Sequence, residues 1–234
     1  MSIITDVMTS MGADEIKAKQ FDTYYKLLIE WNEKINLTAI TDETDAAYKH
    51  FVDCISPLTM GKLNPNSSVI DVGTGAGFPG LVLKIFEPGL NLTLVDSLNK
   101  RVNFLNEVIK ELGLSGVTTI HSRAEELGKN KAHREKYDYC VSRAVANLAT
   151  LSELCLPLVR VGGEFISLKG PKAQDEVAEA KKAIGVMGGE FDEIINYNIG
   201  ETDYDHNLVI IKKKSATPPA YPRNAPKPSK EPIK

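Results

Sequence analysis

The sequence predicts an α/β fold in which a mostly parallel sheet is flanked by helices and preceded by a helical extension. Three observations predict it. Short β-rich runs alternate with helical patterns from residue 68 onward, a glycine-rich turn joins the first run to the first helix, and residues 14–60 carry helical periodicity alone. A chain of 234 residues, 42% hydrophobic and 25% charged, is long enough for one such domain to bury a stable core.

The helical extension is predicted over residues 1–61. Apolar side chains recur there at three- and four-residue spacing, which is typical of helices with one buried face. The first stripe consists of Phe21, Tyr24, Tyr25, Leu28 and Trp31, and the second of Ala47, Phe51, Cys54, Ile55 and Leu58. Pro57 and Gly61 close the second stripe.

The α/β core is predicted over residues 62–214. Its expected strands are Val69–Val72, Leu92–Asp96, Val117–His121, Tyr139–Ser142, Glu164–Lys169 and Leu208–Lys212. Its expected helices are Pro79–Phe86, Asn99–Leu112, Asn147–Leu156 and Pro171–Ile184. This alternation favours a doubly wound sheet.

The C-terminal tail, residues 215–234, is basic and rich in proline. Residues 212–234 hold seven Lys or Arg against one acid, and six of the chain's twelve prolines. The rest of the chain holds 21 basic and 30 acidic side chains. A basic end on an acidic body could bind phosphates, and it could equally be a solvated, disordered terminus.

Composition argues against several classes of protein. The three cysteines form no CxxC pair, so we expect neither a disulfide framework nor a zinc site. His50 and Cys54 lie one helical turn apart, but two side chains do not make a metal site, and we expect no metal. No basic and apolar leader opens the chain, and no run approaches about 18 apolar residues. We therefore expect a cytoplasmic protein without a membrane span.

The strongest local signal is the segment IDVGTGAGFPG, residues 70–80. A strand runs into a turn that contains Gly73, Gly75 and Gly77, and a helix is expected to open at Pro79. Glycine lets the backbone approach a ligand closely. By itself such a turn could hold NAD, FAD or S-adenosylmethionine, or could be only a tight turn.

Asp96 ends the second expected strand, 23 residues after Gly73. A carboxylate at this place can accept hydrogen bonds from both ribose hydroxyls of a nucleoside. The alternative role is an ordinary helix N-cap, because the next helix is expected to begin at Asn99. The distance from the glycine turn favours the ribose role.

Two further features favour S-adenosylmethionine over a dinucleotide. Counted from its first glycine, Gly73, the glycine run lacks the GxGxxG spacing that a pyrophosphate favours. The third strand leads into Ala124 and Glu125, which would then lie beside an adenine, and the fourth ends at residues 142–144 (Ser-Arg-Ala). Ligands bind at these carboxyl ends, so Arg143 is expected where substrate meets cofactor. Glu125 could instead start a surface helix, and Arg143 could be an ion-pair partner.

In these motifs and in others along the chain, the sequence resembles the bacterial 16S ribosomal RNA guanine-N7 methyltransferases, the glucose-inhibited division protein B family. Matching segments occur in order along nearly the whole chain. They are Trp31-Asn32, Ile35–Ile40, Asp71–Gly80, Asp96-Ser97, Lys100-Arg101, Phe104-Leu105, Arg123–Glu125, Ser142-Arg143-Ala144, Leu168–Gly170 and Tyr221–Arg223.

The resemblance implies a Rossmann-like class I methyltransferase fold with a mostly parallel seven-stranded sheet. It also implies S-adenosylmethionine as cofactor, 16S rRNA of the small ribosomal subunit as partner, and N7 of a guanine as methyl acceptor. Together with the motifs, it predicts cofactor contacts at Gly73, Gly75, Gly77, Phe78, Asp96, Ser97, Ala124, Glu125 and Arg143. We expect a monomer.

Methylation of N7 requires no proton transfer by a side chain. N7 of guanine is an exposed lone pair with no proton to remove, so a general base is unnecessary and positioning is the main task. Arg143 is our candidate for that catalytic, positioning role. Cys140 lies inside a strand and is expected in the core rather than as a nucleophile.

The candidate RNA-binding residues are Lys169, Lys172, Arg223 and Lys227, each of which could equally be a solvated cation. The tail departs from the family pattern, since Pro226 and Glu231 stand where the family usually has glycine and lysine. Three other functions stay open on the residues alone. They are a nicotinamide-dependent oxidoreductase, a non-catalytic RNA-binding protein with a vestigial nucleotide fold, and a small-molecule methyltransferase.

Overall fold

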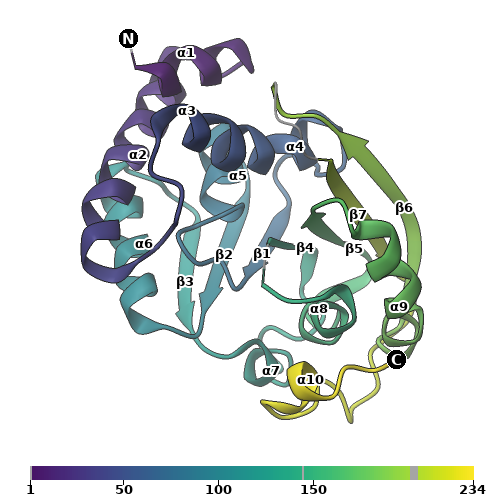
Figure 1. The fold of residues 1–234 in the computed structure, drawn as a ribbon. Helices are drawn as coiled ribbons and strands as arrows, with labels where there is room; N and C mark the ends of the chain where they lie inside the picture. The colour runs from purple at the N-terminus through teal and green to yellow at the C-terminus, as the bar shows by residue number, and fades with distance from the viewer. Residues whose placement is uncertain (1, 144, 201–204) are drawn as a thin grey trace.

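The structure is a computed structural model that describes residues 2–143, 145–200 and 205–234. Within these ranges seven strands form one sheet in the order β3-β2-β1-β4-β5-β7-β6 (Figure 1). The strands are β1 (Ser68–Val72), β2 (Asn91–Asp96), β3 (Val117–His121), β4 (Tyr137–Arg143), β5 (Val159–Lys169), β6 (Gly189–Tyr197) and β7 (His206–Lys213). Strand β7 is antiparallel to both of its neighbours, and the other pairs are parallel.

The strand order creates a crevice at the centre of the sheet. From β1 the chain moves outward through β2 to β3, and it then returns to β4 on the other side of β1. Connections therefore leave the carboxyl ends of β1 and β4 in opposite directions. Open α/β sheets bind ligands at such a switch point.

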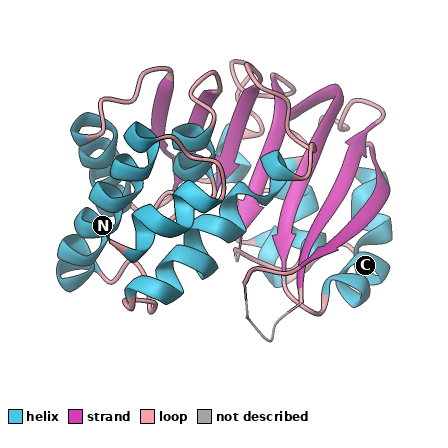
Figure 2. Cartoon of the chain, turned by 90° about the horizontal axis from the view of Figure 1, so that it is seen from above, coloured by secondary structure: helices cyan, strands magenta, loops and turns pink. Residues whose placement is uncertain are grey.

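Helices cover both faces of the sheet (Figure 2). One face carries α1 (Ile3–Ser10), α2 (Glu15–Ile35), α3 (Glu43–Ala46), the π-helix η1 (Ala47–Val52), α4 (Asp53–Thr59), α5 (Gly80–Phe86) and α6 (Asn99–Glu111). The other carries α7 (Ala124–Leu127), α8 (Leu148–Cys155), α9 (Ala173–Val186) and α10 (Lys227–Lys230). None of the described helices combines the length and apolarity needed to cross a bilayer.

Strand residues alternate between the two resulting cores. Val69 and Ile166 belong to the cluster under α2, α4 and α5, whereas Ile70 and Phe165 belong to the cluster under α8 and α9. Successive side chains of a strand point to opposite faces, so a strand buried on both faces is apolar throughout. This is why the central strands stand out in the sequence.

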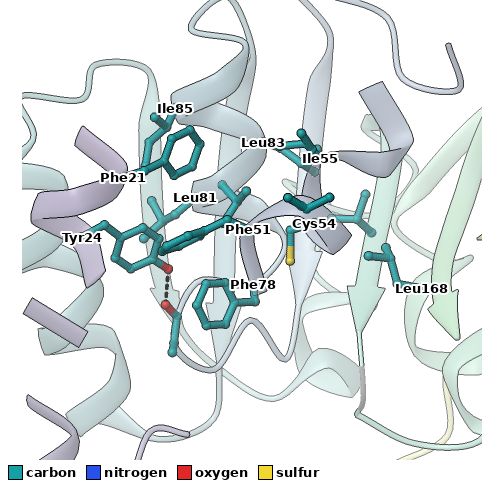
Figure 3. Packing of buried hydrophobic residues seen from close by; sticks show 14 of the residues in the cluster. Phe21, Tyr24, Phe51, Cys54, Ile55, Phe78, Leu81, Leu83, Ile85 and Leu168 are labelled. Carbon is teal, nitrogen blue, oxygen red and sulfur yellow. Dashed lines mark hydrogen bonds between the residues drawn. The ribbon is translucent and has the colours of Figure 1, made fainter. Parts of the chain in front are cut away.

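The N-terminal helices share their core with the sheet rather than forming a separate body. Tyr24 lies 5.6 Å, ring to ring, from both Phe51 and Phe78, and Phe21 lies 5.2 Å from Phe51 (Figure 3). The hydroxyl of Tyr24 donates a hydrogen bond to the carbonyl oxygen of Ala76 in the glycine turn. Helix α2 is therefore tied directly to the turn that follows β1.

The predicted α/β fold and its six located strands are confirmed. Strand β3 has its expected bounds, and the other five extend one to five residues beyond an expected end. Strand β6 and helix α1 were not foreseen. Only Tyr197 of β6 is classed as buried, so the strand lacks the apolar run that marks β1 and β4. The helical stretch expected over residues 14–60 is interrupted, because Asn36 adopts a left-handed conformation with φ 51° and ends α2.

The tail is packed on the body, so its interpretation as a disordered terminus is wrong. The Arg134 guanidinium donates to the carbonyl oxygens of Thr217 (2.6 Å) and Tyr221 (2.8 Å). Arg223 forms a bidentate ion pair with Glu153, whose side chain is 1% exposed. These buried cross-connections order the proline-rich segment against helix α8.

Candidate active site

The glycine turn after β1 adopts a conformation that side chains resist. Gly73, Gly75 and Gly77 have φ values of 71°, 60° and 97°. A Cβ built on Gly73 would lie 2.7 Å from a methyl carbon of Val145. The amides of Gly73 and Thr74 both donate to the carbonyl of Val95, at 2.9 and 3.1 Å, which fastens the turn to β2. Glycine is needed here because the left-handed region is costly for other residues.

A buried carboxyl group supports the turn from below. Oδ2 of Asp71 accepts hydrogen bonds from the Thr74 hydroxyl (2.7 Å) and the Gly80 amide (2.9 Å). Its Oδ1 has no partner among the described residues. Burial raises the pKa of Asp71 to about 7, although those two hydrogen bonds oppose the shift. A proton on Oδ1 fits this arrangement, since the carboxyl group then keeps both of its acceptor contacts.

Asp96 lies at the end of β2 with its side chain 2% exposed. Its Oδ2 accepts a hydrogen bond from the Gly75 amide (3.0 Å), and its Oδ1 accepts one from the Leu98 amide (2.9 Å). Arg101 Nη1 lies 3.4 Å from Oδ2. The N-cap of α6 is Leu98, which makes no side-chain capping bond, so Asp96 does not have the capping role considered above. Its carboxylate instead joins β2 to the glycine turn.

Two adjoining cavities flank Asp96. One of about 370 Å³ is lined by Leu37, Thr38, His50, Gly73, Thr74, Gly75, Ala76, Phe78, Asp96, Ser97, Arg101, Arg143 and Val145. The other, of about 190 Å³, is lined by Val72, Gly73, Val95, Asp96, Ser97, Ser122, Arg123, Ala124, Glu125, Val145, Leu154 and Ser229. Of the nine predicted cofactor residues, eight line one or both cavities, and Gly77 lies behind the turn against Tyr24. Ser229, from the tail, was not foreseen there.

Arg143 lies at the end of β4 in an ion pair with a residue that sequence reasoning missed. Its Nη1 donates to Oδ2 of Asp53 (3.0 Å) and to the carbonyl of Lys49 (2.8 Å). Its guanidinium carbon lies 5.0 Å from the centre of the Phe78 ring, a cation–π contact. The ion-pair alternative for Arg143 is therefore correct as a contact, and it coexists with a place on the wall of the cavity.

His50 is neutral and its tautomer is set by its neighbours. Its Nδ1 lies 3.1 Å from Arg143 Nη2, which can only donate, so Nδ1 must accept. Its Nε2, 2.9 Å from the Thr38 hydroxyl, then carries the proton. Burial and the Arg143 charge lower the pKa of His50 to about 3. The ring also stacks on Phe78 with 4.5 Å between centroids.

Asp53 anchors this cluster. Its Oδ1 accepts hydrogen bonds from Tyr197 (2.6 Å) and His206 (3.1 Å), which come from β6 and β7. Burial raises the pKa of Asp53, but His206, Arg143 and Tyr197 lower it by more, and the net pKa lies below the ordinary value. Asp53 is therefore an anion that neutralises Arg143. Both His50 and Asp53 are held where η1 joins α4, and π-helical turns occur frequently at functional sites.

A third and larger cavity, of about 680 Å³, adjoins the others at His50, Arg143 and Val145. Its remaining lining residues are Ile40, Lys49, Asp53, Ala146, Asn147, Leu168, Lys169, Gly170, Glu176 and His206. It has both the apolar surface and the convergent polar groups that are typical of a ligand site.

The four predicted RNA-binding cations have different surroundings. Lys169 is in the large cavity, with its side chain 7% exposed and its ammonium 2.7 Å from Glu176 Oε2. Arg223 is occupied by Glu153. Lys172 is exposed at the start of α9, and Lys227 is exposed with its ammonium 4.0 Å from Glu231.

Sequence reasoning missed Thr38, His50, Asp53, Arg101 and Val145 as parts of the site. Thr38 and Arg101 stand in segments that matched the family, so that signal was available. Nothing local marks Asp53, which is 90 residues from Arg143 in the chain. Ala144, the last residue of the expected Ser-Arg-Ala motif, lies outside the described residues. Across the described ranges no three His, Cys, Asp or Glu side chains are grouped so as to hold a metal ion.

Comparisons with known proteins agree with this geometry. Residues 17–203 match the model of the GidB family, described as rRNA small subunit methyltransferase G. The proteins of that name from Desulforamulus reducens and Alkaliphilus metalliredigens are 54% and 51% identical to this chain. The first alignment covers 91% of this chain and 89% of the relative, and the second 99% and 98%.

Solved structures with the same fold are more distant in sequence. A SAM-dependent methyltransferase from Aquifex aeolicus aligns with a TM-score of 0.53 and 20% identity over 73% of this chain and 93% of its own. TrmN from Thermus thermophilus aligns with a TM-score of 0.53 and 19% identity over 68% of this chain and 48% of its own. These likenesses confirm the Rossmann-like class I fold. The chain belongs to the GidB family, the family of rRNA small subunit methyltransferase G.

Proposed function

We propose that this chain transfers the methyl group of S-adenosylmethionine to N7 of a guanine in 16S rRNA of the small ribosomal subunit. The observation that carries the proposal is the junction of cavities at Arg143. The cavity of about 370 Å³ beside the glycine turn and Asp96 meets the large cavity there, and the cavity of about 190 Å³ adjoins both at Val145. Family membership favours this function over the nicotinamide-dependent and non-catalytic alternatives.

The residues around Asp96 suit S-adenosylmethionine. The Asp96 carboxylate faces both smaller cavities and can accept the ribose hydroxyls, while Gly75 leaves open space where another residue would have a side chain. On this proposal the cofactor is held by Gly73, Gly75, Phe78, Asp96, Ser97, Ala124, Glu125 and Arg143, with Gly77 shaping the turn. The cofactor supplies an electrophilic sulfonium methyl group.

The side chains at the junction suit positioning rather than proton transfer. His50 cannot act as a base, because its Nδ1 already accepts from Arg143 and its Nε2 carries a proton. Arg143 is a cation, and Asp53 at 3.0 Å offsets its charge, which limits its repulsion of a sulfonium. N7 attack needs no base, so a rigid, charge-balanced wall is sufficient.

The remaining parts of the proposal concern organisation. We propose that residues 1–61, 62–214 and 215–234 act as extension, core and tail of one globular monomer. The shared core of α2 with the sheet and the Arg223–Glu153 pair support this. Exposed Lys172 and Lys227 are the available phosphate contacts of the four predicted cations. An enzyme that acts on the small ribosomal subunit works in the cytoplasm, where that substrate lies.

The test is transfer of labelled methyl from S-adenosylmethionine to small subunits that lack the modification, with naked 16S RNA alongside. Strand cleavage at N7-methylguanine then maps the product. We expect label at one guanine. Cofactor binding without any label on RNA would rule out the ribosomal substrate. Arg143→Ala is expected to lose turnover, and near-normal turnover would rule out its positioning role.

A further inference from the structure

The large cavity contains a carboxylate whose second oxygen is free. Glu176, on α9, lines the cavity with its side chain 27% exposed. Its Oε2 accepts hydrogen bonds from the Leu148 amide (2.8 Å) and the Lys169 ammonium (2.7 Å). Among the described residues no donor lies on Oε1, whose two lone pairs therefore remain available.

An open carboxylate is unexpected in a cavity that receives RNA. Phosphate groups carry negative charge, and a carboxylate that lines the cavity repels them. In Asp53, the other acid that lines the cavity, both carboxylate oxygens accept hydrogen bonds, from Arg143, Tyr197 and His206. Of these two acids, Glu176 alone has an oxygen without a donor among the described residues, so its fitting partner is a hydrogen-bond donor.

Lys169 adds a complementary donor next to that acceptor. An ammonium group has three N–H donors. Two of them are used by the carbonyl of Ala146 (2.8 Å) and by Glu176 Oε2 (2.7 Å). The third has no acceptor among the described residues. The Lys169–Glu176 pair therefore presents one donor beside one acceptor with two free lone pairs.

We propose that the Lys169–Glu176 pair recognises the Watson–Crick edge of the target guanine, with Glu176 as a specificity-determining residue. Oε1 of Glu176 accepts from N1–H and the 2-amino group, and Lys169 donates to O6. This inference deepens the proposed function and rests on it. A base can reach the cavity only after it leaves its stack, as in other enzymes that modify bases.

Guanine alone among the four bases matches this pattern. It has O6 as acceptor, then N1–H and an amino group as donors along one edge. Adenine and cytosine have an unprotonated ring nitrogen where guanine has N1–H, and a carboxylate repels that lone pair. Uracil has one ring N–H flanked by two carbonyl oxygens. Held in this way, guanine keeps N7 free, and on the side of the base away from Glu176.

The test compares guanine with inosine, which lacks only the 2-amino group and keeps O6, N1–H and N7. Small subunits are reconstituted with 16S RNA that carries guanine or inosine at the target position, and kcat/KM is measured for each. For the wild-type chain we expect inosine to lower kcat/KM about tenfold or more, the cost of losing a hydrogen bond to a charged group.

The informative variant is Glu176→Gln. Its carbonyl oxygen stays with the Leu148 amide and Lys169, so its NH₂ faces the cavity and meets the guanine amino group donor to donor. We expect the preference for guanine over inosine to fall to about threefold or less. Lys169→Met is the matched control. This variant breaks the same ion pair but keeps the Glu176 carboxylate. We therefore expect kcat/KM to fall for guanine and for inosine alike, while the preference for guanine stays near the wild-type value.

The outcomes separate the two proposals. No methylation of guanine by the wild-type chain overturns the proposed function. If the wild-type chain methylates guanine but prefers it to inosine less than threefold, the role of Glu176 is overturned and the proposed function stands. The same holds if Glu176→Gln keeps the wild-type preference for guanine. If Glu176→Gln is inactive on both particles, Glu176→Asp decides. It withdraws the carboxylate by one methylene, and an unchanged preference in this variant also overturns the proposal.

Discussion

The hydrogen bond from Tyr24 to the glycine turn offers a sharp test of how the N-terminal helices support the site. Tyr24→Phe removes one oxygen atom from a fully buried side chain and leaves the ring, 5.6 Å from those of Phe51 and Phe78, unchanged (Figure 3). The carbonyl of Ala76 then loses its donor. Leaving a buried acceptor unsatisfied costs about 1 to 3 kcal/mol.

We expect Tyr24→Phe to lower Tm by about 2 to 4 °C for each kcal/mol lost, the range for a chain of this size. We also expect weaker binding of S-adenosylmethionine, because Ala76 belongs to the turn that lines the cavity beside Asp96. Thermal unfolding measures the change in Tm, and titration calorimetry with the cofactor measures the change in affinity.

Tyr25→Phe is the matched control. Its hydroxyl donates to the carbonyl of Thr41 (2.8 Å) in an exposed contact, so water can replace it. We expect Tyr25→Phe to change the free energy of unfolding by no more than about 0.5 kcal/mol and to leave the cofactor affinity unaltered. Equal effects of the two substitutions would refute the reasoning that Tyr24 supports the turn.

Three further predictions concern buried ionisable groups. Burial raises the pKa of Asp71 to about 7 in the folded protein, whereas the pKa in the unfolded chain is about 4. The stabilisation that protonated Asp71 contributes is therefore complete below a pH of about 4 and is lost as pH rises through about 7. Wild-type stability in urea should therefore fall relative to Asp71→Asn between pH 5 and pH 8, and parallel pH profiles would contradict this. Arg223→Ala leaves Glu153 charged and buried, so we expect the free energy of unfolding to fall by about 3 to 5 kcal/mol. Arg223→Lys should restore only part of this loss, because lysine cannot pair bidentately. Urea unfolding measures both changes, and an unaltered urea midpoint in Arg223→Ala would exclude an anchoring role. His50, with a pKa of about 3, stays neutral across the working range, so single-turnover methyl transfer should be flat with pH from about 6.5 to 8.5. A rate that rises tenfold per pH unit there would instead indicate a general base.

Much of the fold was predictable because its signals are local. The central strands are buried on both faces, so their apolar runs are conspicuous, and the glycine turn and Asp96 are close in sequence and joined by neighbouring strands. Strand β6 escaped prediction because its burial is slight, and α1 because its buried stripe comprises only Ile4 and Met8. The tail was ambiguous because its charge and prolines say nothing of the buried Glu153 that pairs with Arg223.

The sequence by itself determined the α/β class, the mostly parallel, doubly wound sheet, the glycine turn, and the choice of Asp96 and Arg143 as candidates. Only the tertiary structure decided which groups meet at Arg143. Lys49 and Asp53, which contact Arg143, lie 94 and 90 positions from it in the chain. The physical reason is that periodicity records which face of an element is buried, whereas ion pairs and cavities depend on the packing of elements that the chain connects only remotely.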